Sequence, residues 1–160
     1  DFPVCRPEIM EFYNDSNWIE KGKQLLIYGN YGNYKTSHAI QIALKIIREY
    51  QWKCLYYKTS ELPKLLMNDN SVENNIKSKN TKLVIWDNFG KEGSEKFGGK
   101  VFDALEWRIH NFLSNILIVN ADLKVIEEIY GGAMASRILA FIHVPMDGED
   151  KRSKIKFGRK

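Results

Sequence analysis

The sequence alternates short apolar runs with segments in which apolar residues recur at helical spacing. The runs predict strands at Gln24–Tyr28, Lys53–Tyr57, Lys82–Trp86, Asn115–Val119 and Phe141–Val144. The helical spacing predicts helices at Thr36–Tyr50, Val101–Phe112, Leu123–Tyr130 and Ala133–Leu139. Strands that are apolar along their whole length are typical of parallel strands covered on both faces. The pattern therefore predicts a three-layer α/β fold, with a mostly parallel five-stranded sheet flanked by helices.

The segments between these elements are polar and rich in turn-forming residues. Residues 68–81 contain many Asn, Ser and Lys residues and predict a polar loop or a short surface helix. Four glycines in Asn88–Lys100 predict a mobile loop. Ser60 can cap a short helix that carries Pro63 in its first turn. A further helix is expected at the N-terminal entry to the domain.

Composition and charge add a basic tail to this picture. A chain of 160 residues with 44% hydrophobic residues suits one domain, which we place at residues 1–150. The net charge of +4 is uneven, because residues 151–160 carry six basic side chains and no acidic one. The tail is expected to contact nucleic-acid phosphates or to be a solvated end. No apolar run approaches the roughly 20 residues of a membrane helix, so no membrane partner is expected.

The cysteines and histidines show no metal-ligand spacing. Cys5 and Cys54 are expected to be free thiols, although the sequence leaves a disulfide between them open. His38, His110 and His143 are scattered along the chain and are interpreted as structural. No transition-metal site is predicted from these residues.

The segment Gly29–Thr36 carries most of a phosphate-binding loop pattern, G-x-x-x-x-G-K-[ST], between a predicted strand and helix. Three of the four fixed positions match, while Tyr34 stands where the pattern has its second glycine. In such loops backbone N–H groups surround the phosphates, the lysine neutralises their charge and the hydroxyl binds Mg²⁺. The predicted nucleotide-binding residues here are Gly29, Asn30, Tyr31, Gly32, Asn33, Tyr34, Lys35, Thr36 and Ser37. The alternative is a Gly/Asn turn with a surface lysine.

Two further predicted strands end in polar residues. Asp87 follows Leu83–Trp86 and has the position of a Walker B carboxylate, so Thr36 and Asp87 are the predicted Mg²⁺ residues. Asn88 stands where hydrolytic enzymes of this class usually carry an acidic residue. An amide can orient water but cannot accept its proton, so slow hydrolysis is expected. Asn120 follows Asn115–Val119 and should lie beside Asp87; an ordinary loop cap at either position is the alternative.

This ordered set of motifs, over roughly Ile9–Arg152, resembles the ATPase domain of DnaC/DnaI-type AAA+ helicase loaders and the related transposition helper IstB. Gly29–Thr36 is similar to the Walker A region, Leu83–Gly90 to the Walker B region, and Asn120 to sensor 1. Tyr34 and Asn88 depart from the family pattern at the site of the chemistry. The family's N-terminal helicase-binding domain is expected to be absent from this chain.

The resemblance also implies roles for three arginines. Arg108 lies in the family's helix before the sensor strand. The segment Ala135–Ile138 is similar to the family's Ser-Arg-Leu segment, which implies that Arg137 is an arginine finger reaching a neighbouring subunit's γ-phosphate. Arg152 would stand at a sensor-2-like position. Both Arg137 and Arg152 could instead be ordinary surface charges. With Asn88 and Asn120, they complete the predicted catalytic set.

The function implied by the resemblance is that of an ATP- or ADP-binding, Mg²⁺-dependent assembly factor for DNA replication. It would self-associate through Arg137 and load a replicative helicase on single-stranded DNA, which it would bind weakly with help from its tail. It would act in the cytoplasm, encoded by a bacterium, phage or plasmid, with slow ATP hydrolysis. The alternatives are a pseudo-ATPase interaction module, an IstB-like transposition helper and a small-molecule kinase; no arginine-rich lid supports the last.

Overall fold

The computed structural model of the chain describes residues 7–30, 32, 34–90, 95–130 and 132–146. Five strands form one sheet in which every neighbouring pair is parallel. The strands are β1 (Gln24–Tyr28), β2 (Lys53–Lys58), β3 (Thr81–Asp87), β4 (Ser114–Val119) and β5 (Ile142–Pro145). Their order across the sheet is β2-β3-β4-β1-β5. The predicted α/β fold is confirmed, and its five strands are all parallel.

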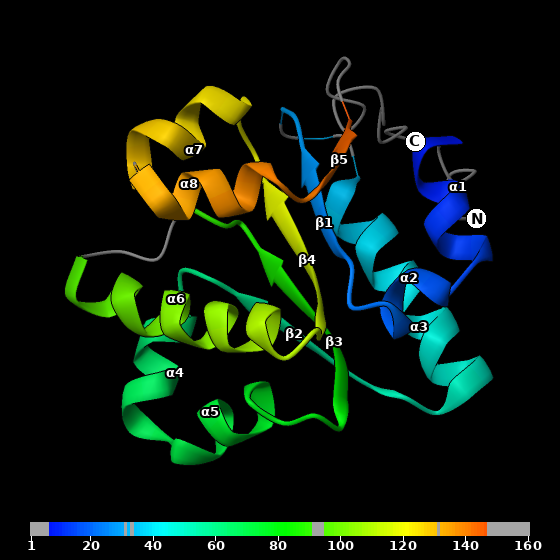
Figure 1. The fold of residues 1–160 in the computed structure, drawn as a ribbon, viewed down its shortest axis with the longest axis horizontal. Coiled ribbons are helices and arrows are strands. Elements are labelled where there is room, and N and C mark those ends of the chain that lie inside the picture. The colour runs from blue at the N-terminus through cyan, green and yellow to red at the C-terminus, as the bar shows by residue number, and fades with distance from the viewer. Residues whose placement is uncertain (1–6, 31, 33, 91–94, 131, 147–160) are drawn as a thin grey trace, which may run out of the picture.

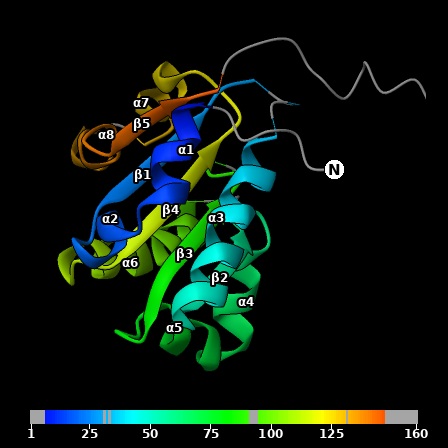
Figure 2. The ribbon, with the colours of Figure 1, turned by 90° about the vertical axis from the view of Figure 1, so that its right-hand side faces the viewer.

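Helices cover both faces of the sheet and complete the three layers (Figures 1 and 2). One face carries α1 (Pro7–Asn14), α2 (Asn17–Glu20) and α3 (Lys35–Tyr50). The other carries α4 (Leu62–Asn68), α5 (Asn70–Ile76), α6 (Glu95–His110), α7 (Leu123–Tyr130) and α8 (Gly132–Leu139). α1 and α2 lie at the N-terminal entry, where the sequence analysis expects a helix.

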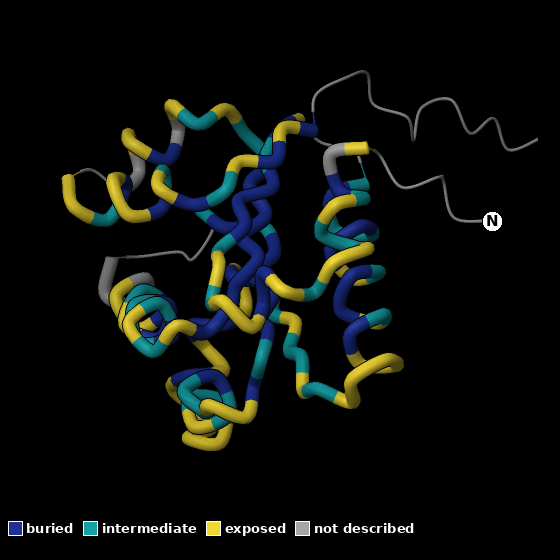
Figure 3. The backbone as a smooth tube through the Cα atoms, turned by 45° about the vertical axis from the view of Figure 1, so that its right-hand side comes forward, coloured by how far each residue is buried: buried dark blue, intermediate teal, exposed yellow. Residues whose placement is uncertain are grey.

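The core consists of two apolar layers, one on each face of the sheet. Successive side chains of β1 alternate between them: Leu25 and Ile27 pack on the α3 side, and Leu26 packs on the α6 side. All three are fully buried, because the sheet is covered on both faces. Figure 3 shows the resulting buried centre, with exposed residues on the outer helices and connections. This rigid sheet fixes where the strand ends lie.

Arg108 of α6 forms a buried polar centre near the amino ends of β3 and β4. It is fully buried, and its guanidinium donates to Asn115 Oδ1 at 2.8 Å. Three backbone carbonyls also accept from it, those of Ile76 and Thr81 at 3.0 Å and of Ser114 at 2.9 Å. Burial lowers the pKa of Arg108 to about 10, so the group stays charged at neutral pH. Arg108 therefore connects α5, α6, β3 and β4 at the amino ends of the strands, opposite their carboxyl ends.

Helix α6 corrects one sequence-based prediction. It begins at Glu95, not at Val101, so the predicted loop Asn88–Lys100 is wrong over its last residues; residues 91–94 lie outside the described part of the chain. Gly98 and Gly99 favoured a loop, since each glycine costs a helix about 1 kcal/mol. The buried face formed by Val101, Ala104, Leu105 and Arg108 anchors the helix and outweighs that cost.

Smaller outcomes concern caps and isolated residues. The N-cap of α4 is Glu61 and not Ser60, while Pro63 does lie in its first turn. α5 shows that residues 68–81 include a short surface helix.

Cys54 is a free thiol, and burial raises its pKa to about 11, whereas Cys5 lies outside the described residues. Within the described ranges, no helix has the length and apolar character needed to span a membrane.

Candidate functional site

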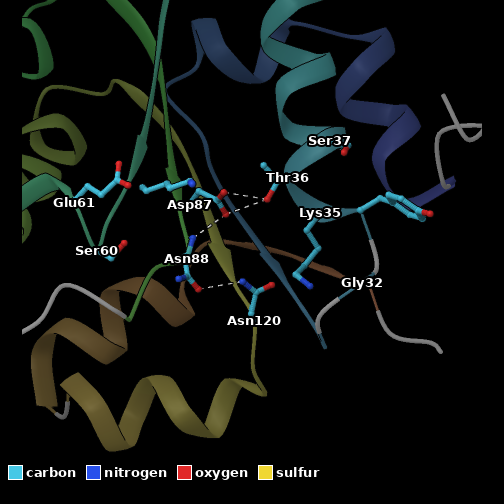
Figure 4. A pocket seen from close by; sticks show the side chains of 11 residues that line it. Gly32, Lys35, Thr36, Ser37, Ser60, Glu61, Asp87, Asn88 and Asn120 are labelled. Atoms are coloured by element: carbon cyan, nitrogen blue, oxygen red, sulfur yellow. Dashed lines mark hydrogen bonds between the residues drawn. The ribbon is translucent and has the colours of Figure 1, made fainter. Parts of the chain in front are cut away.

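A cavity of about 470 Å³ opens at the carboxyl ends of the central strands (Figure 4). Segments that follow β1, β2, β3 and β4 build its wall, as expected where the carboxyl ends of parallel strands meet. The lining residues are Gly32, Tyr34, Lys35, Thr36, Ser37, Lys58, Ser60, Glu61, Asp87, Asn88 and Asn120. The fold thus brings most of the described candidate residues to one place.

The loop between β1 and α3 turns through unusual backbone conformations. φ is 140° at Gly29 and 82° at Gly32, values that glycine tolerates. Tyr34 has φ 57° and ψ 26°, so a bulky residue occupies the left-handed conformation for which the pattern normally has glycine. Such a conformation costs roughly 1–2 kcal/mol. Tyr31 and Asn33 of the predicted loop lie outside the described residues.

Two contacts from His38 hold the strained Tyr34 backbone in place. The carbonyl oxygen of Tyr34 accepts from the His38 backbone N–H at 3.0 Å and lies 2.6 Å from His38 Nδ1. Because a carbonyl can only accept, Nδ1 carries the proton in this contact. His38 is 2% exposed in the first turns of α3. His38 thus stabilises the backbone of the loop, in agreement with its interpretation as a structural residue.

Lys35 begins α3 and places its charge inside the loop. Its side chain is 3% exposed, and Nζ donates to the carbonyl oxygen of Asn30 at 2.5 Å. Buried lysines are rare and need polar partners, which the loop supplies here. The helix N-terminus adds its partial positive charge at the same point. The loop therefore presents a concentrated positive potential to the cavity.

Asp87 ends β3 and is 8% exposed, with hydrogen-bond donors on both carboxylate oxygens. Thr36 Oγ1 lies 3.1 Å from each oxygen, and the Asn88 backbone N–H donates to Oδ1 at 2.8 Å. The Tyr56 hydroxyl donates to Oδ2 at 2.5 Å. Desolvation, followed by the hydrogen bond to and the charge of Asp87, raises the pKa of Tyr56 well above its usual range. The structure thus brings Thr36 and Asp87, the predicted Mg²⁺ residues, into direct contact.

Asn88 and Asn120 interact through their side chains beside Asp87 (Figure 4). Asn120 Nδ2 donates to Asn88 Oδ1 at 3.2 Å, so the ends of β3 and β4 meet as the sequence predicted. Asn88 has a left-handed φ of 55°, which asparagine tolerates better than most residues. Its carbonyl oxygen accepts from Thr59 Oγ1 at 2.7 Å. The two amides thus sit in ordered positions at the cavity wall.

The sequence analysis missed the contribution of the segment that follows β2. Lys58, Ser60 and Glu61 line the cavity, and Tyr56 contacts Asp87. The rule that placed Asp87 and Asn120 at the carboxyl end of the sheet also places the end of β2 there. The sequence does not show which strand β2 pairs with. In the structure β2 lies beside β3, and this pairing brings the segment to the site.

The two predicted arginines lie away from this cavity or outside the described residues. Arg137 lies on α8, its side chain is 45% exposed, and it forms an ion pair with Glu106 of α6. It does not line the cavity of its own chain. Arg152 and the basic tail 151–160 lie outside the described residues. The structure therefore leaves the roles of Arg137 and Arg152 as predictions.

The residues that are present fit a magnesium-bound polyphosphate. Thr36 Oγ1 and the Asp87 carboxylate offer the oxygen ligands that Mg²⁺ prefers, directly or through water. Lys35 and the N-terminus of α3 offer positive charge for phosphate oxygens. The cavity joins both sets of groups. This chemistry suits a phosphate-bearing anion better than an uncharged ligand.

Several solved structures share this fold. The DnaC helicase loader aligns with a TM-score of 0.75 at 17% identity, over 91% of this chain and 93% of that one. DnaI aligns with a TM-score of 0.73 at 19% identity, over 95% and 87%. AMPPCP-bound DnaA from Aquifex aeolicus aligns with a TM-score of 0.72 at 19% identity, over 95% of this chain and 50% of that one. The chain thus shares the fold of the DnaC and DnaI structures.

No protein-family model matches the sequence, and no curated protein matches it. At identities below 20%, these three structural likenesses establish the fold alone.

Proposed function

We propose that this chain binds ATP and ADP with Mg²⁺ and acts as a nucleotide-switched assembly factor in DNA replication, loading a replicative helicase on single-stranded DNA. The observation that carries the proposal is the convergence of Lys35, Thr36, Asp87 and Asn120 at one cavity. The likeness to a DnaC helicase loader and to a DnaA solved with AMPPCP supports it. The proposed setting is the cytoplasm of a bacterium, with a phage or plasmid gene as a further source.

The proposed roles follow from charge and position. The loop from Gly29 to Ser37 holds the phosphates, and Lys35 neutralises the β- and γ-oxygens. Thr36 and Asp87 would hold Mg²⁺, which would supply positive charge to neutralise the phosphates. Asn88 and Asn120 orient a water molecule near the γ-phosphate by hydrogen bonding. Neither amide can take up the proton of that water, so proposed turnover is slow.

Isothermal titration calorimetry with ATP and ADP, each with and without Mg²⁺, tests the proposal. We expect saturable binding of both nucleotides, with Mg²⁺ tightening the binding. No heat of binding for either nucleotide would contradict the proposal and favour a pseudo-ATPase that serves as an interaction module. Transfer of phosphate to a small molecule, without release of inorganic phosphate, would instead indicate a kinase.

Assembly is the second part of the proposal. Arg137 would reach the γ-phosphate bound by a neighbouring copy, and it would exchange its ion pair with Glu106 for that phosphate. ATP at a subunit interface would then stabilise assembly by mass action, and loss of the γ-phosphate would release it. The tail 151–160 would add weak, salt-sensitive contacts to single-stranded DNA. Affinity capture of the protein from its native host, with and without ATP, would identify the partner.

Asn88→Glu should raise the rate of ATP hydrolysis. A carboxylate at this position can accept the proton of the attacking water, and general-base assistance typically contributes about 10²–10⁴-fold. Glutamate fits the left-handed φ at position 88 less well than asparagine, so part of this rate increase is lost. We therefore expect the hydrolysis rate to rise at least about tenfold. Phosphate release measured under saturating ATP checks the prediction.

Asn88→Gln is the matched control for this substitution. It has the same length as the glutamate variant and can still accept from Asn120, but it carries no base. Its rate should stay at the wild-type level. A wild type that already turns over several ATP per second, or equal rates in the two variants, would contradict the assignment.

Tyr34→Gly should tighten nucleotide binding. Glycine relieves the left-handed strain of about 1–2 kcal/mol at a residue that lines the cavity, and it lets phosphate approach the backbone. If the whole of that energy favours the bound loop, affinity rises by up to roughly 30-fold. Titration of ATP into both proteins, side by side, measures the change.

Gln51→Gly provides the control for backbone strain. Gln51 caps the other end of α3 in the same left-handed conformation, with φ 55°, and it does not line the cavity. This substitution should raise the unfolding midpoint without changing nucleotide affinity. A weaker-binding Tyr34→Gly protein would show that the tyrosine ring itself supports the ligand.

A further inference from the structure

We propose that Tyr56 is a positioning residue of the candidate metal site, and that its hydroxyl holds the Asp87 carboxylate in the orientation from which Asp87 and Thr36 serve the same Mg²⁺. This inference rests on the proposed function, because it concerns the Mg²⁺ that accompanies the nucleotide. Tyr56 lies outside the loop and strand-end motifs that define the site in the sequence. It comes from β2, the edge strand beside β3.

The contact between Tyr56 and Asp87 is short and specific. The Tyr56 hydroxyl donates to Asp87 Oδ2 at 2.5 Å. The Asn88 N–H holds the other oxygen, Oδ1, at 2.8 Å, while Thr36 Oγ1 is shared between both oxygens at 3.1 Å. Tyr56 is thus the one donor among these three that acts on Oδ2 alone. Without it, only the shared Thr36 hydroxyl would hold that oxygen.

The number of acceptor positions on Asp87 leaves space for the metal. A carboxylate has about four lone-pair positions, and the three donors supply three hydrogens. One position stays available for Mg²⁺ or for a water molecule bound to it. The torsion that turns a carboxylate about its Cβ–Cγ bond is broad, so its orientation depends on such contacts. Tyr56 therefore limits which lone pair faces the cavity.

The backbone of the same segment supports this arrangement. Thr59 is fully buried just after β2, and its N–H and Oγ1 donate to the Asp87 carbonyl oxygen at 2.9 and 3.1 Å. Thr59 Oγ1 also donates to the carbonyl oxygen of Asn88. The segment from Tyr56 to Thr59 thus fixes both the backbone and the carboxylate of Asp87. A Tyr56 phenol that only packed on the surface would leave the carboxylate without this donor.

The neighbouring tyrosine shows that this contact belongs to position 56. Side chains alternate along β2, so Tyr56 lies on the α3 side, while Tyr57 packs against the core layer on the α6 side. Tyr57 does not line the cavity. Both residues are tyrosines on the same strand, with the same ring and hydroxyl. They differ in whether the hydroxyl can reach Asp87. Tyr57 is therefore a matched control for the loss of one phenolic hydroxyl.

The experiment compares Tyr56→Phe and Tyr57→Phe with the wild type. The affinity of a fluorescent ADP derivative is measured with excess Mg²⁺ and, separately, with EDTA. Removing a group that orients a metal ligand typically weakens metal binding by about 10–100-fold. Tyr56→Phe should therefore weaken binding at least about tenfold with Mg²⁺ and leave the affinity in EDTA unchanged. Tyr57→Phe should match the wild type in both conditions.

The other outcomes separate this inference from the proposed function. If the wild type binds no nucleotide with Mg²⁺, the proposed function fails, and the metal role of Tyr56 fails with it. If the wild type binds and Tyr56→Phe binds equally well or more tightly with Mg²⁺, only the positioning role is overturned. An equal loss with Mg²⁺ and with EDTA also overturns it, because the hydroxyl would then act on the loop or the fold. Thermal unfolding confirms that each variant is folded.

Discussion

Lys35→Ala should weaken ATP binding by roughly 10–150-fold, because a hydrogen bond to a charged group contributes about 1.5–3 kcal/mol. The structure gives the reason for so large an effect. Lys35 is 3% exposed and donates to Asn30 within the loop, so its ammonium is held where phosphate oxygens are expected. A surface lysine would be screened by water and would contribute much less. Calorimetry on the two proteins, with Mg²⁺ present, measures the difference.

Lys45→Ala is the matched control for this result. Lys45 lies on the same helix, donates to the carbonyl oxygen of Tyr13 and pairs with Glu49, away from the cavity. Its loss should leave nucleotide affinity unchanged. Equal affinity in the wild type and in Lys35→Ala would rule out the loop as the phosphate site. Equal weakening in both lysine variants would indicate a general loss of positive charge.

Arg108→Ala should reduce the free energy of unfolding by about 3–5 kcal/mol, the range typical of truncating a large, fully buried side chain to alanine. Three backbone carbonyls and Asn115 would lose a donor in a place that water does not reach. Each buried acceptor left without a partner costs about 1–3 kcal/mol. The cavity left by the side chain adds to this loss. Urea denaturation followed by circular dichroism measures the change.

Arg137→Ala offers the comparison at an exposed arginine. Its ion pair with Glu106 is half exposed, and such pairs contribute about 0–1 kcal/mol. The stability of this variant should therefore stay close to that of the wild type. If Arg108→Ala is no less stable than Arg137→Ala, the network around Arg108 does not hold the amino ends of β3 and β4 together. The test is independent of nucleotide, because Arg108 does not line the cavity.

Much of the fold could be predicted from local pattern alone. Continuous apolar runs marked β1, β3 and β4, since a strand covered on both faces is apolar at most of its positions. Helical spacing gave the bounds of α7 as the structure has them. The half-exposed β2 was also found, because its apolar centre is short and bounded by lysines. Prediction was poorer at α6, where two glycines concealed the start of a helix that tertiary packing stabilises.

The candidate site was predictable where its parts follow strands in obvious motifs. Lys35, Thr36 and Asp87 stand in a recognisable order along the chain, and the rule for parallel strand ends placed them together with Asn120. Tyr34, which stands at the pattern's second glycine position, has the left-handed backbone that glycine tolerates best. These residues were identifiable because each motif depends on neighbours in sequence, or on a general property of parallel sheets.

Local pattern along the chain was enough to predict the α/β class, the strand positions and the loop that carries Lys35. Which strand lies beside β3 depends on the folded arrangement, and so does the contact of Tyr56 and Thr59 with Asp87 and its backbone. The folded arrangement also decided that Arg108 is a buried structural centre. Most of these contacts join residues 27 to 32 positions apart in the chain, and their partners follow from strand order and helix packing. Local periodicity records which face of an element is buried, but not which element covers it.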